Sequence, residues 1–434
     1  MKVGLLLIFL AVHILATGQD TQLSLQECIA LAISNNHEIM DYDYQISSIN
    51  NDVRNEKQKF LPVMSAQINN GVTSGFQQVF SDLMAGQYET IRAYANNAVF
   101  DLSMPIWTAN ANKVLVSKRE IEAESLQSQK ANKELDVKFK VIEKFYGIAL
   151  AQKRYEITLN EKISQDSVLI VTKSLFDIGE KSFRDVVDAE SNLEQIKYEL
   201  KLEEYKVENA RRQLADIVRI DELPYITIDD LQIEVELPSF EEFYDVVIAK
   251  HPSIRCQNIM VESADFEVQY YKRSLLPSIS LNYQAGTSGQ IFDTGKNTSM
   301  VSQWKHNAYQ TAQINIKIPI FNYTANVSQL SKAKIERDRN VMALERKKLD
   351  LRAELQQLYS DMLQSIEVVL SVRKNEEMIR KQYEYAIKDY MLGNMASYEL
   401  NVYKMKNKEA QLSSIQAGYE LRYKYAIFQL IVEE

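Results

Sequence analysis

The residue types that most often carry out chemistry in proteins are scarce in this chain and widely separated. Its histidines show no metal-ligand spacing, and it contains no HExxH, GxSxG, P-loop or GxGxxG motif. Two cysteines are too few for a disulfide framework or a four-cysteine zinc site, although one disulfide between them stays open as an alternative. The sequence therefore predicts no enzyme, no cofactor and no metal site. These residues are His13, His37, His251, His306, Cys28 and Cys256.

The composition describes a protein built from long, uninterrupted elements. Of 434 residues only 12 are Gly and 7 are Pro, against roughly 12% of both together in average proteins. So few turn-forming residues exclude a Greek-key sandwich and favour long helices. A formal net charge of −9 argues against a nucleic-acid partner, for which a basic surface is expected.

The first 18 residues have the pattern of a secretory signal peptide. Lys2 precedes an apolar run from Val3 to Ala16, and small residues follow up to Gly18. We therefore expect cleavage near Gly18, with an uncleaved anchor as the alternative. The rest of the chain has no run of 18 apolar residues, so we expect no membrane-spanning helix in it.

The remaining sequence contains the same unit twice, at a spacing of 213 to 215 residues. We predict a first structural repeat at 19–218, a linker at 219–238 and a second repeat at 239–434. The matching segments are Ser24-Leu25-Gln26-Glu27 with Ser239-Phe240-Glu241-Glu242, Leu61-Pro62 with Leu276-Pro277, Thr73-Ser74-Gly75 with Thr287-Ser288-Gly289, Met104-Pro105-Ile106-Trp107 with Ile318-Pro319-Ile320-Phe321, and Gly179 with Gly393.

Each repeat is predicted to contain a helix, two strands, a very long helix, a hairpin and a last helix. The strands are indicated by alternation of apolar and polar residues, as in Ile279, Leu281 and Tyr283 against Ser280 and Asn282. One face of each strand should therefore be apolar and the other polar. The predicted ranges are strands at 63–75, 93–106, 278–289 and 307–319, a long helix at 108–178 and a following helix at 182–218.

The long helix carries two apolar seams on opposite flanks, which predicts coiled-coil neighbours on both sides. One seam runs through Leu135, Ile142 and Ala149, and the other through Val141 and Ile148.

Four strands of bilayer length cannot close a barrel, and an open sheet edge is not tolerated in lipid. The pattern therefore predicts either a barrel shared among subunits or strands of a soluble sheet. A homotrimer would supply twelve strands and place the long helices side by side in a ring.

Over residues 19–434 the chain resembles the TolC-type outer-membrane efflux proteins. The resemblance rests on the duplicated unit, the Leu-Pro pairs before the strands, the Pro-Ile-aromatic segments after them, and two aromatic-x-x-Gly hairpins. These hairpins are Phe176-Asp177-Ile178-Gly179 and Tyr390-Met391-Leu392-Gly393. The resemblance implies a mainly α fold, with a periplasmic α-barrel of long coiled-coil helices and a 12-stranded trimeric transmembrane β-barrel in outer-membrane lipid. It also implies a periplasmic adaptor (membrane fusion protein) and an inner-membrane transporter as partners.

The resemblance further assigns a gate and a docking surface to the hairpins. Carried onto this sequence, the pore constriction falls on Asp185, Asp188 and Glu399, although Val402 lacks the second acid of the family pattern. Ordinary solvated carboxylates and plain helix turns remain the alternatives. The hairpin turns, which the family uses for adaptor docking, are Gly179, Glu180, Lys181, Gly393, Asn394 and Met395.

The expected function is the exit channel of a tripartite efflux system, in the outer membrane and reaching into the periplasm. Substrates would pass through it passively from transporter and adaptor to the exterior. A channel for type I protein secretion shares this architecture and stays open as an alternative. A soluble periplasmic coiled-coil adaptor or scaffold is the alternative from a different class. The sequence does not identify the transported substrate.

Overall fold

The structure is a computed structural model in which most of the chain beyond the predicted signal peptide is described. The signal peptide, most of the predicted linker and Gly393 lie outside the described residues. The described ranges are 23–79, 87–221, 223, 237–292, 298–320, 323–392 and 394–433.

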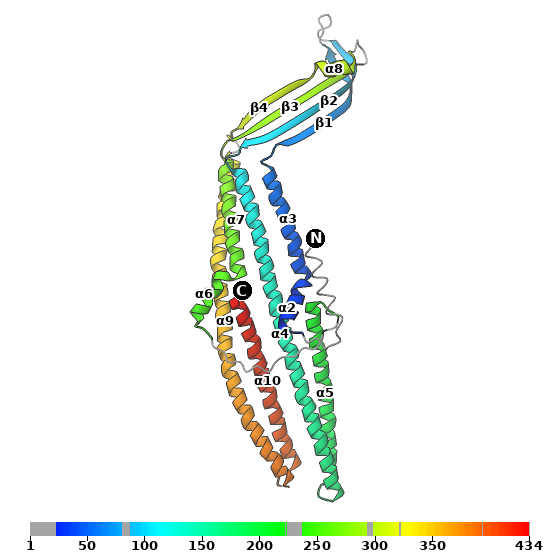
Figure 1. The fold of residues 1–434 in the computed structure, drawn as a ribbon, viewed down its shortest axis with the longest axis vertical. Helices are drawn as coiled ribbons and strands as arrows, with labels where there is room; N and C mark the ends of the chain where they lie inside the picture. The colour runs from blue at the N-terminus through cyan, green and yellow to red at the C-terminus, as the bar shows by residue number, and fades with distance from the viewer. Residues whose placement is uncertain are drawn as a thin grey trace. The chain divides into compact units, whose positions relative to one another are not determined.

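Long helices and four strands make up the described chain, as predicted (Figure 1). The longest helices have 67 and 69 residues, which corresponds to about 100 Å each at 1.5 Å per residue. In chain order the elements are α2 (Leu25–Ser34), α3 (His37–Gln58), β1 (Val63–Val79), β2 (Gln87–Trp107), α4 (Ala111–Asp177), α5 (Phe183–Val218), α6 (Phe240–Lys250), α7 (Pro252–Ser274), β3 (Ser278–Phe292), α8 (Met300–His306), β4 (Tyr309–Lys317), α9 (Tyr323–Met391) and α10 (Ser397–Glu433).

The chain divides into two compact units, and each combines segments from both halves of the sequence. The helical unit contains residues 1–43, 128–255 and 346–434, and the sheet unit contains residues 44–127 and 256–345.

The sheet unit is built on one antiparallel sheet with the strand order β1-β2-β3-β4. β1 pairs with β2 from Val63 to Val79, so both strands continue beyond their predicted ranges. β4 pairs with β3 along only nine residues, Tyr309–Lys317. One edge of β1 and one edge of β4 have no strand partner among the described residues.

The two faces of the sheet differ as the alternation predicted. The register aligns Met64, Leu102, Tyr283 and Ala312 across the four strands, and these residues share the apolar face. On the same face Ile68, Val72, Ile314 and Ile316 are exposed. The opposite face carries Ser, Gln, Asn and Asp, and Gln284 donates a hydrogen bond to Asp101 there.

The helix ends follow from short local motifs. Ser24 and Glu27 form a capping box at the start of α2, and Ser239 and Glu242 repeat it at the start of α6. The repeated capping box is the structural counterpart of the repeated sequence. Pro62 disfavours helical backbone at Leu61, and α3 ends before it, at Gln58.

Within the helical unit, each pair of long helices has its own apolar core. Val141 and Ile148 on α4 pack with Leu214 and Val218 on α5 and with Cys28 on α2. The second core contains Met362 and Val369 on α9 and Ala417 and Leu421 on α10. Both predicted seams of α4 are buried, including Leu135, Ile142 and Ala149 of the first.

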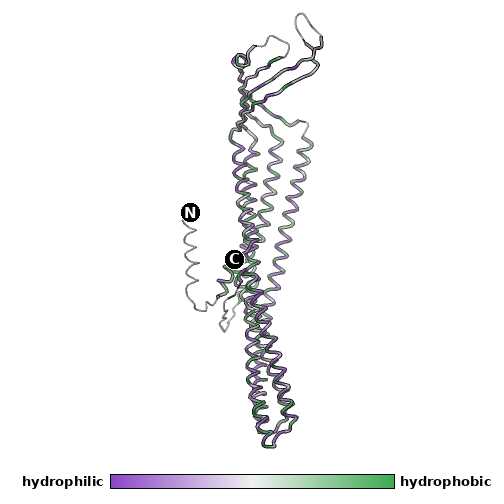
Figure 2. Tube along the Cα trace, turned by 90° about the vertical axis from the view of Figure 1, so that its right-hand side faces the viewer, coloured by the Kyte–Doolittle hydropathy of each residue, from purple (hydrophilic) through white to green (hydrophobic). Residues whose placement is uncertain are grey.

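No helix in the described part of the chain is long and apolar enough to cross a membrane, and hydrophobic and hydrophilic residues are mixed along the helices in Figure 2. Cys28 and Cys256 are free thiols. Burial in the helical core raises the pKa of Cys28 to about 11.

Candidate functional site

The predicted gate and docking residues lie at the two helical hairpins of the helical unit. In the first hairpin, α4 ends at Asp177 and Gly179 adopts φ +84°, a conformation that glycine reaches without strain. The backbone N–H of Glu180 donates to the carbonyl of Leu175 at 2.9 Å and closes the helix end. The sequence motif aromatic-x-x-Gly therefore marks the point where the chain reverses.

The second hairpin repeats this arrangement between α9 and α10. The backbone N–H of Asn394 donates to the carbonyl of Asp389 at 2.9 Å. Gly393 lies outside the described residues. Asn394 is exposed and Met395 is partly buried, and α10 begins at Ser397.

The three predicted gate carboxylates lie at the starts of α5 and α10, and each makes its contacts within its own hairpin. Asp185 Oδ2 accepts hydrogen bonds from the backbone N–H and the hydroxyl of Ser182, at 2.9 and 2.7 Å. Asp188 lies 4.0 Å from the guanidinium of Arg184, and both side chains are exposed. Glu399 accepts a hydrogen bond from the Tyr398 hydroxyl at 2.9 Å.

Asp185 therefore has a local role that its sequence neighbours explain. With Ser182 it forms a capping box that satisfies N–H groups at the start of α5. The hydrogen bonds from the Ser182 side chain and backbone lower the pKa of Asp185. Asp188 and Glu399 have no such role.

We expect the start of α5 to lose stability at acid pH in a way that depends on Asp185. A lowered pKa in the folded state means that this stabilisation is present above the ordinary pKa of Asp and is lost as the pH falls through the lowered one. The protection factors of the amides of residues 182–186, which correct hydrogen exchange for its intrinsic pH dependence, should fall over that range. Asp185→Asn should remove most of this pH dependence and cost about 1 kcal/mol of local stability. Asp188→Asn is the matched control, and equal behaviour of the two variants would contradict the capping role.

The hairpin tips also expose large apolar side chains. Ile178 and Phe183 of the first tip are both 68% exposed, and Met391 and Leu392 of the second are 79% and 73% exposed. Such a patch, with charged Glu180 and Lys181 beside it, is typical of a protein contact surface. The predicted turn residues are thus one part of a larger surface that we call the tip surface. It is formed by Ile178, Gly179, Glu180, Lys181, Phe183, Met391, Leu392, Asn394 and Met395.

The two hairpins are joined to each other by polar contacts. At the tips the Lys181 ammonium lies 4.6 Å from the centre of the Tyr390 ring, a cation–π contact. Further along, Arg154 of α4 donates to Gln416 of α10 at 2.9 Å. The apolar cores lie within the hairpins, whereas the α4–α10 contacts described here are hydrophilic.

The centre of this α4–α10 contact is a group of charged residues that we call the inter-hairpin cluster: Glu161 and Gln165 on α4, Glu199 on α5, and Lys404 and Lys408 on α10. Lys404 donates to Gln165 at 2.7 Å and lies 3.6 Å from Glu161. Lys408 lies 2.8 Å from Glu161 and also contacts Glu199. Glu161 and Lys404 are only 15% and 14% exposed.

The pKa values of the two lysines are shifted in opposite directions. Burial lowers the pKa of Lys404, and Glu161 opposes this only in part. Burial would also lower the pKa of Lys408, but the hydrogen bonds to Glu161 and Glu199 outweigh it and raise that pKa. A polar cavity of about 370 Å³ adjoins the cluster. A polar, partly hollow contact of this kind holds two rigid hairpins together less firmly than an apolar core does.

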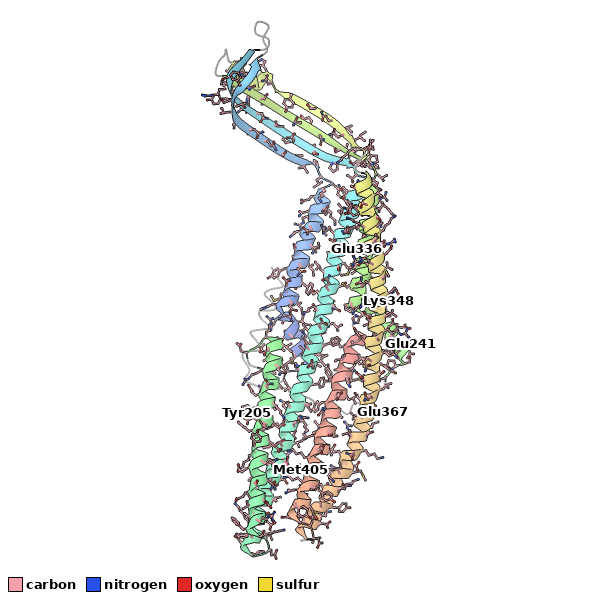
Figure 3. All side chains as sticks on the ribbon, turned by 180° about the vertical axis from the view of Figure 1, so that it is seen from behind. Tyr205, Glu241, Glu336, Lys348, Glu367 and Met405 are labelled. Atoms are coloured by element: carbon pink, nitrogen blue, oxygen red, sulfur yellow. The ribbon has the colours of Figure 1, made fainter. Side chains whose placement is uncertain are left out.

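Hydrogen bonds between α4 and α5, between α4 and α10 and between α10 and α9 order the four long helices as α5, α4, α10 and α9, with α5 and α9 at the two ends of the row (Figures 1 and 3). Both end helices expose apolar residues at coiled-coil spacing. Tyr198, Leu202 and Tyr205 are exposed on α5, and Leu363 and Leu370 are exposed on α9. Figure 3 labels Tyr205 on α5 and Glu367 on α9, at opposite sides of the row.

The histidines have local contacts rather than a shared site. His251 Nδ1 accepts a hydrogen bond from the backbone N–H of Ser253 at 3.3 Å, and His37 contacts Arg219. Among the described residues no group of three or more His, Cys, Asp or Glu side chains is placed to hold a metal ion.

Comparisons with known proteins agree with this geometry. No curated protein sequence matches the chain significantly. The fold is similar to that of CusC, at 13% identity, covering 94% of this chain and 91% of that one with a TM-score of 0.79. It is also similar to the CmeC outer membrane channel of Campylobacter jejuni (13% identity, 94% and 85% covered, TM-score 0.76) and to the outer membrane protein VceC of Vibrio cholerae (12%, 94% and 95%, 0.75).

The family comparison covers most of the chain. The model of the family described as outer membrane efflux protein matches residues 28–218 and 243–425. These two ranges coincide closely with the two halves of the internal duplication, including both hairpins. The chain therefore belongs to the outer membrane efflux protein family, whose members are channels and not enzymes.

Proposed function

We propose that three copies of this chain form the exit duct of a tripartite efflux system, fixed in the outer membrane and reaching into the periplasm. Substrates would pass passively through the duct from an inner-membrane transporter and a periplasmic adaptor. The observation that carries this proposal is the four-stranded sheet, which has one apolar face, one polar face and two edges without a strand partner in the described chain.

Elementary membrane physics explains why such a sheet needs partner copies. Backbone N–H and C=O groups that stay unpaired in hydrocarbon cost several kcal/mol each, so strands cross a bilayer only in closed barrels. About eight strands are the smallest number that closes. β4 has nine residues, and about 9–11 tilted residues cross the hydrocarbon core. Three copies would supply twelve strands, with the apolar face toward lipid and the polar face toward water.

The helical unit supports the same assembly independently. Its row of four helices has exposed apolar residues at both ends, on α5 and on α9. If copies are arranged in a ring, the α5 end of one row meets the α9 end of the next, and both stripes are covered. This arrangement also gives α5 and α9 a helix neighbour on each side, as helices with apolar heptad positions on two flanks require.

Fractionation of cells that make the full-length protein tests the proposal. We expect the protein in the outer-membrane fraction, as a detergent-resistant band of three chains that dissociates to a 50.1 kDa or slightly smaller band on heating. Recovery as a soluble monomer would reject the proposal in favour of a periplasmic scaffold.

Within this assembly the gate is proposed at the hairpin starts. Three copies of Glu399, together with Asp185 and Asp188, would ring the narrow periplasmic mouth with carboxylates. A ring of one sign in a constricted, low-dielectric passage concentrates counter-ions. Asp188 and Glu399 are the better candidates, because Asp185 is already engaged in its capping box.

We expect Glu399→Gln to weaken block of the channel by multivalent cations. The substitution removes one carboxylate per copy while keeping the size of the side chain and its ability to accept from Tyr398. Single-channel recordings in planar bilayers, with a trivalent cation added on the periplasmic side, should show an inhibition constant at least several-fold higher. Glu399→Asp keeps the charge and serves as the control. Unchanged block in Glu399→Gln would remove Glu399 from the gate.

The tip surface is proposed as the docking site for the periplasmic adaptor. Its apolar side chains, Ile178, Phe183, Met391 and Leu392, are largely exposed among the described residues, and Lys181 and Glu180 add polar specificity at the rim. Gly393, which belongs to the predicted docking turn, is part of the same proposal from sequence alone.

A further inference from the structure

The part of β3 that follows Gly286 has a feature that the proposed duct does not explain. β3 has 15 residues, but β4 covers only Ser278–Gly286 of it. Beyond Gly286 the edge of β3 that faces β4 has no strand partner among the described residues. An uncovered edge of this kind is a template for pairing with another chain.

Helix α8 covers this edge with side-chain amides. Gln290 donates its backbone N–H to Gln303 Oε1 at 2.7 Å, and Gln303 Nε2 donates to the Gln290 carbonyl at 2.9 Å. These are the two bonds that a residue of a neighbouring strand would make. Asn307 Nδ2 donates to the carbonyl of Ser288, two residues away on β3, at 2.8 Å.

Further contacts seat α8 against the apolar face of the sheet. Trp304 Nε1 donates to Asn96 of β2 at 2.6 Å, and Asn96 donates to Asn70 of β1 at 2.9 Å. Thr287 of β3 donates its hydroxyl to the Trp304 carbonyl at 2.7 Å. The helix is thereby tied to three strands.

The absence of a side chain at Gly289 leaves room for Met300 and Trp304 of α8 against the sheet. A Cβ at position 289 would overlap Met300 Sδ and would lie 3.2 Å from Trp304 Cδ1, a tight contact. A side chain at this position therefore requires the Met300 side chain to move aside and crowds Trp304 of α8.

We infer that α8 is an edge cap that ends strand pairing at Gly286 and thereby fixes the register in which a second copy of this chain can add its β1 to β4. The inference rests on the proposed oligomeric duct. The partner is the free edge of β1 in a second copy of the chain. This strand has 17 residues, and its other edge pairs with β2. With α8 in place, the free edge of β1 can pair only with the nine residues of β4. Beyond Gly286 the place beside β3 is already occupied by α8. Without α8, β3 would offer a second edge and β1 of the neighbour would have alternative registers.

The test is a cysteine cross-linking scan between copies, in the full chain with Cys28 and Cys256 replaced by Ala. One cysteine is fixed at Thr311 on β4, and a second is moved along β1 from Val63 to Val79. In the otherwise unchanged protein we expect covalent trimers at one β1 position, with lower yield at its neighbours. In Gly289→Val, and separately in Gln303→Ala with Asn307→Ala, we expect the yield to spread over positions two or more residues away. The trimer band should also dissociate at a lower temperature.

Gln313→Ala is the matched control, because it removes an amide from the same sheet outside the α8 contacts. The two variants disturb α8 in different ways, so a failure of one of them to assemble still leaves the other as a test. Cross-linking of both variants in the unchanged register, with unchanged heat resistance, would overturn the edge-cap inference. Absence of cross-links between copies in the starting protein at every position would instead contradict the oligomeric duct itself.

Discussion

Replacement of Ile314 by Arg should prevent stable insertion of this protein in the outer membrane. Ile314 lies on the apolar face of β4 and is 67% exposed within the chain. In the proposed barrel it faces lipid, where an arginine costs about 2–4 kcal/mol near the middle of the bilayer. Because each trimer carries three copies, the total cost is on the order of 10 kcal/mol. The heat-sensitive trimer band in the outer-membrane fraction should fall by at least tenfold.

The adjacent residue supplies a closely matched control. Gln313 belongs to the same strand but points to the polar face, since neighbouring strand residues face opposite sides. Gln313→Arg places the same side chain one position away, in a water-lined interior, and should leave the amount of trimer nearly unchanged. Equal loss in both variants would mean that the two faces are not in different environments, and would contradict the membrane assignment of the sheet.

The second large effect is expected in the inter-hairpin cluster. Glu161→Gln removes the carboxylate that Lys404 and Lys408 share and leaves Lys404 with its hydrogen bond to Gln165. Removing one partner of a buried ion pair costs about 3–5 kcal/mol; since the cluster is partly open to water, we expect about 2–3 kcal/mol here. The hairpins should separate more readily. In single-channel recordings the open probability should rise by one to two orders of magnitude, and cells should become sensitive to large hydrophilic antibiotics.

Two further variants distinguish loss of the cluster from general damage. Glu156→Gln removes a carboxylate from the same helix, but its partner Lys153 is at the surface and the pair is well exposed, so little effect is expected. Glu161→Leu with Lys404→Leu removes this pair together and leaves Lys408 with Glu199 as its partner, so the open probability should return most of the way to that of the unchanged protein. An unchanged open probability in Glu161→Gln would show that the cluster does not hold the hairpins together.

The long elements were predictable because their patterns extend over many residues. Both α4 seams and the alternation of β3 and β4 follow from residue spacing alone, and the paired glycines and Leu-Pro segments located the duplication. β1 and β2 extend further than predicted, to Val79 and back to Gln87, because backbone hydrogen bonds continue the pairing where side-chain alternation fades.

The contacts that matter most for mechanism were not predictable. Lys404 and Gln165 are separated by 239 positions, and Trp304 and Asn96 by 208, so neither pair has a local signal. Helix α8 has seven residues, too few for a periodic pattern. The local role of Asp185 did have a signal, the capping-box spacing Ser182-x-x-Asp185, which was compatible with the gate interpretation and is a simpler explanation of that residue.

The central claim is that three copies of this chain make one duct, and native mass spectrometry of the protein extracted from the outer membrane in mild detergent tests it most directly. The account predicts a single species containing three chains. It also predicts that Tyr205→Glu with Leu370→Glu, which puts charges on both ends of the helix row, lowers the amount of that species. A species of one or two chains in the unchanged protein would contradict the account, because one chain supplies only four strands, too few to close a barrel, and two supply eight instead of the predicted twelve.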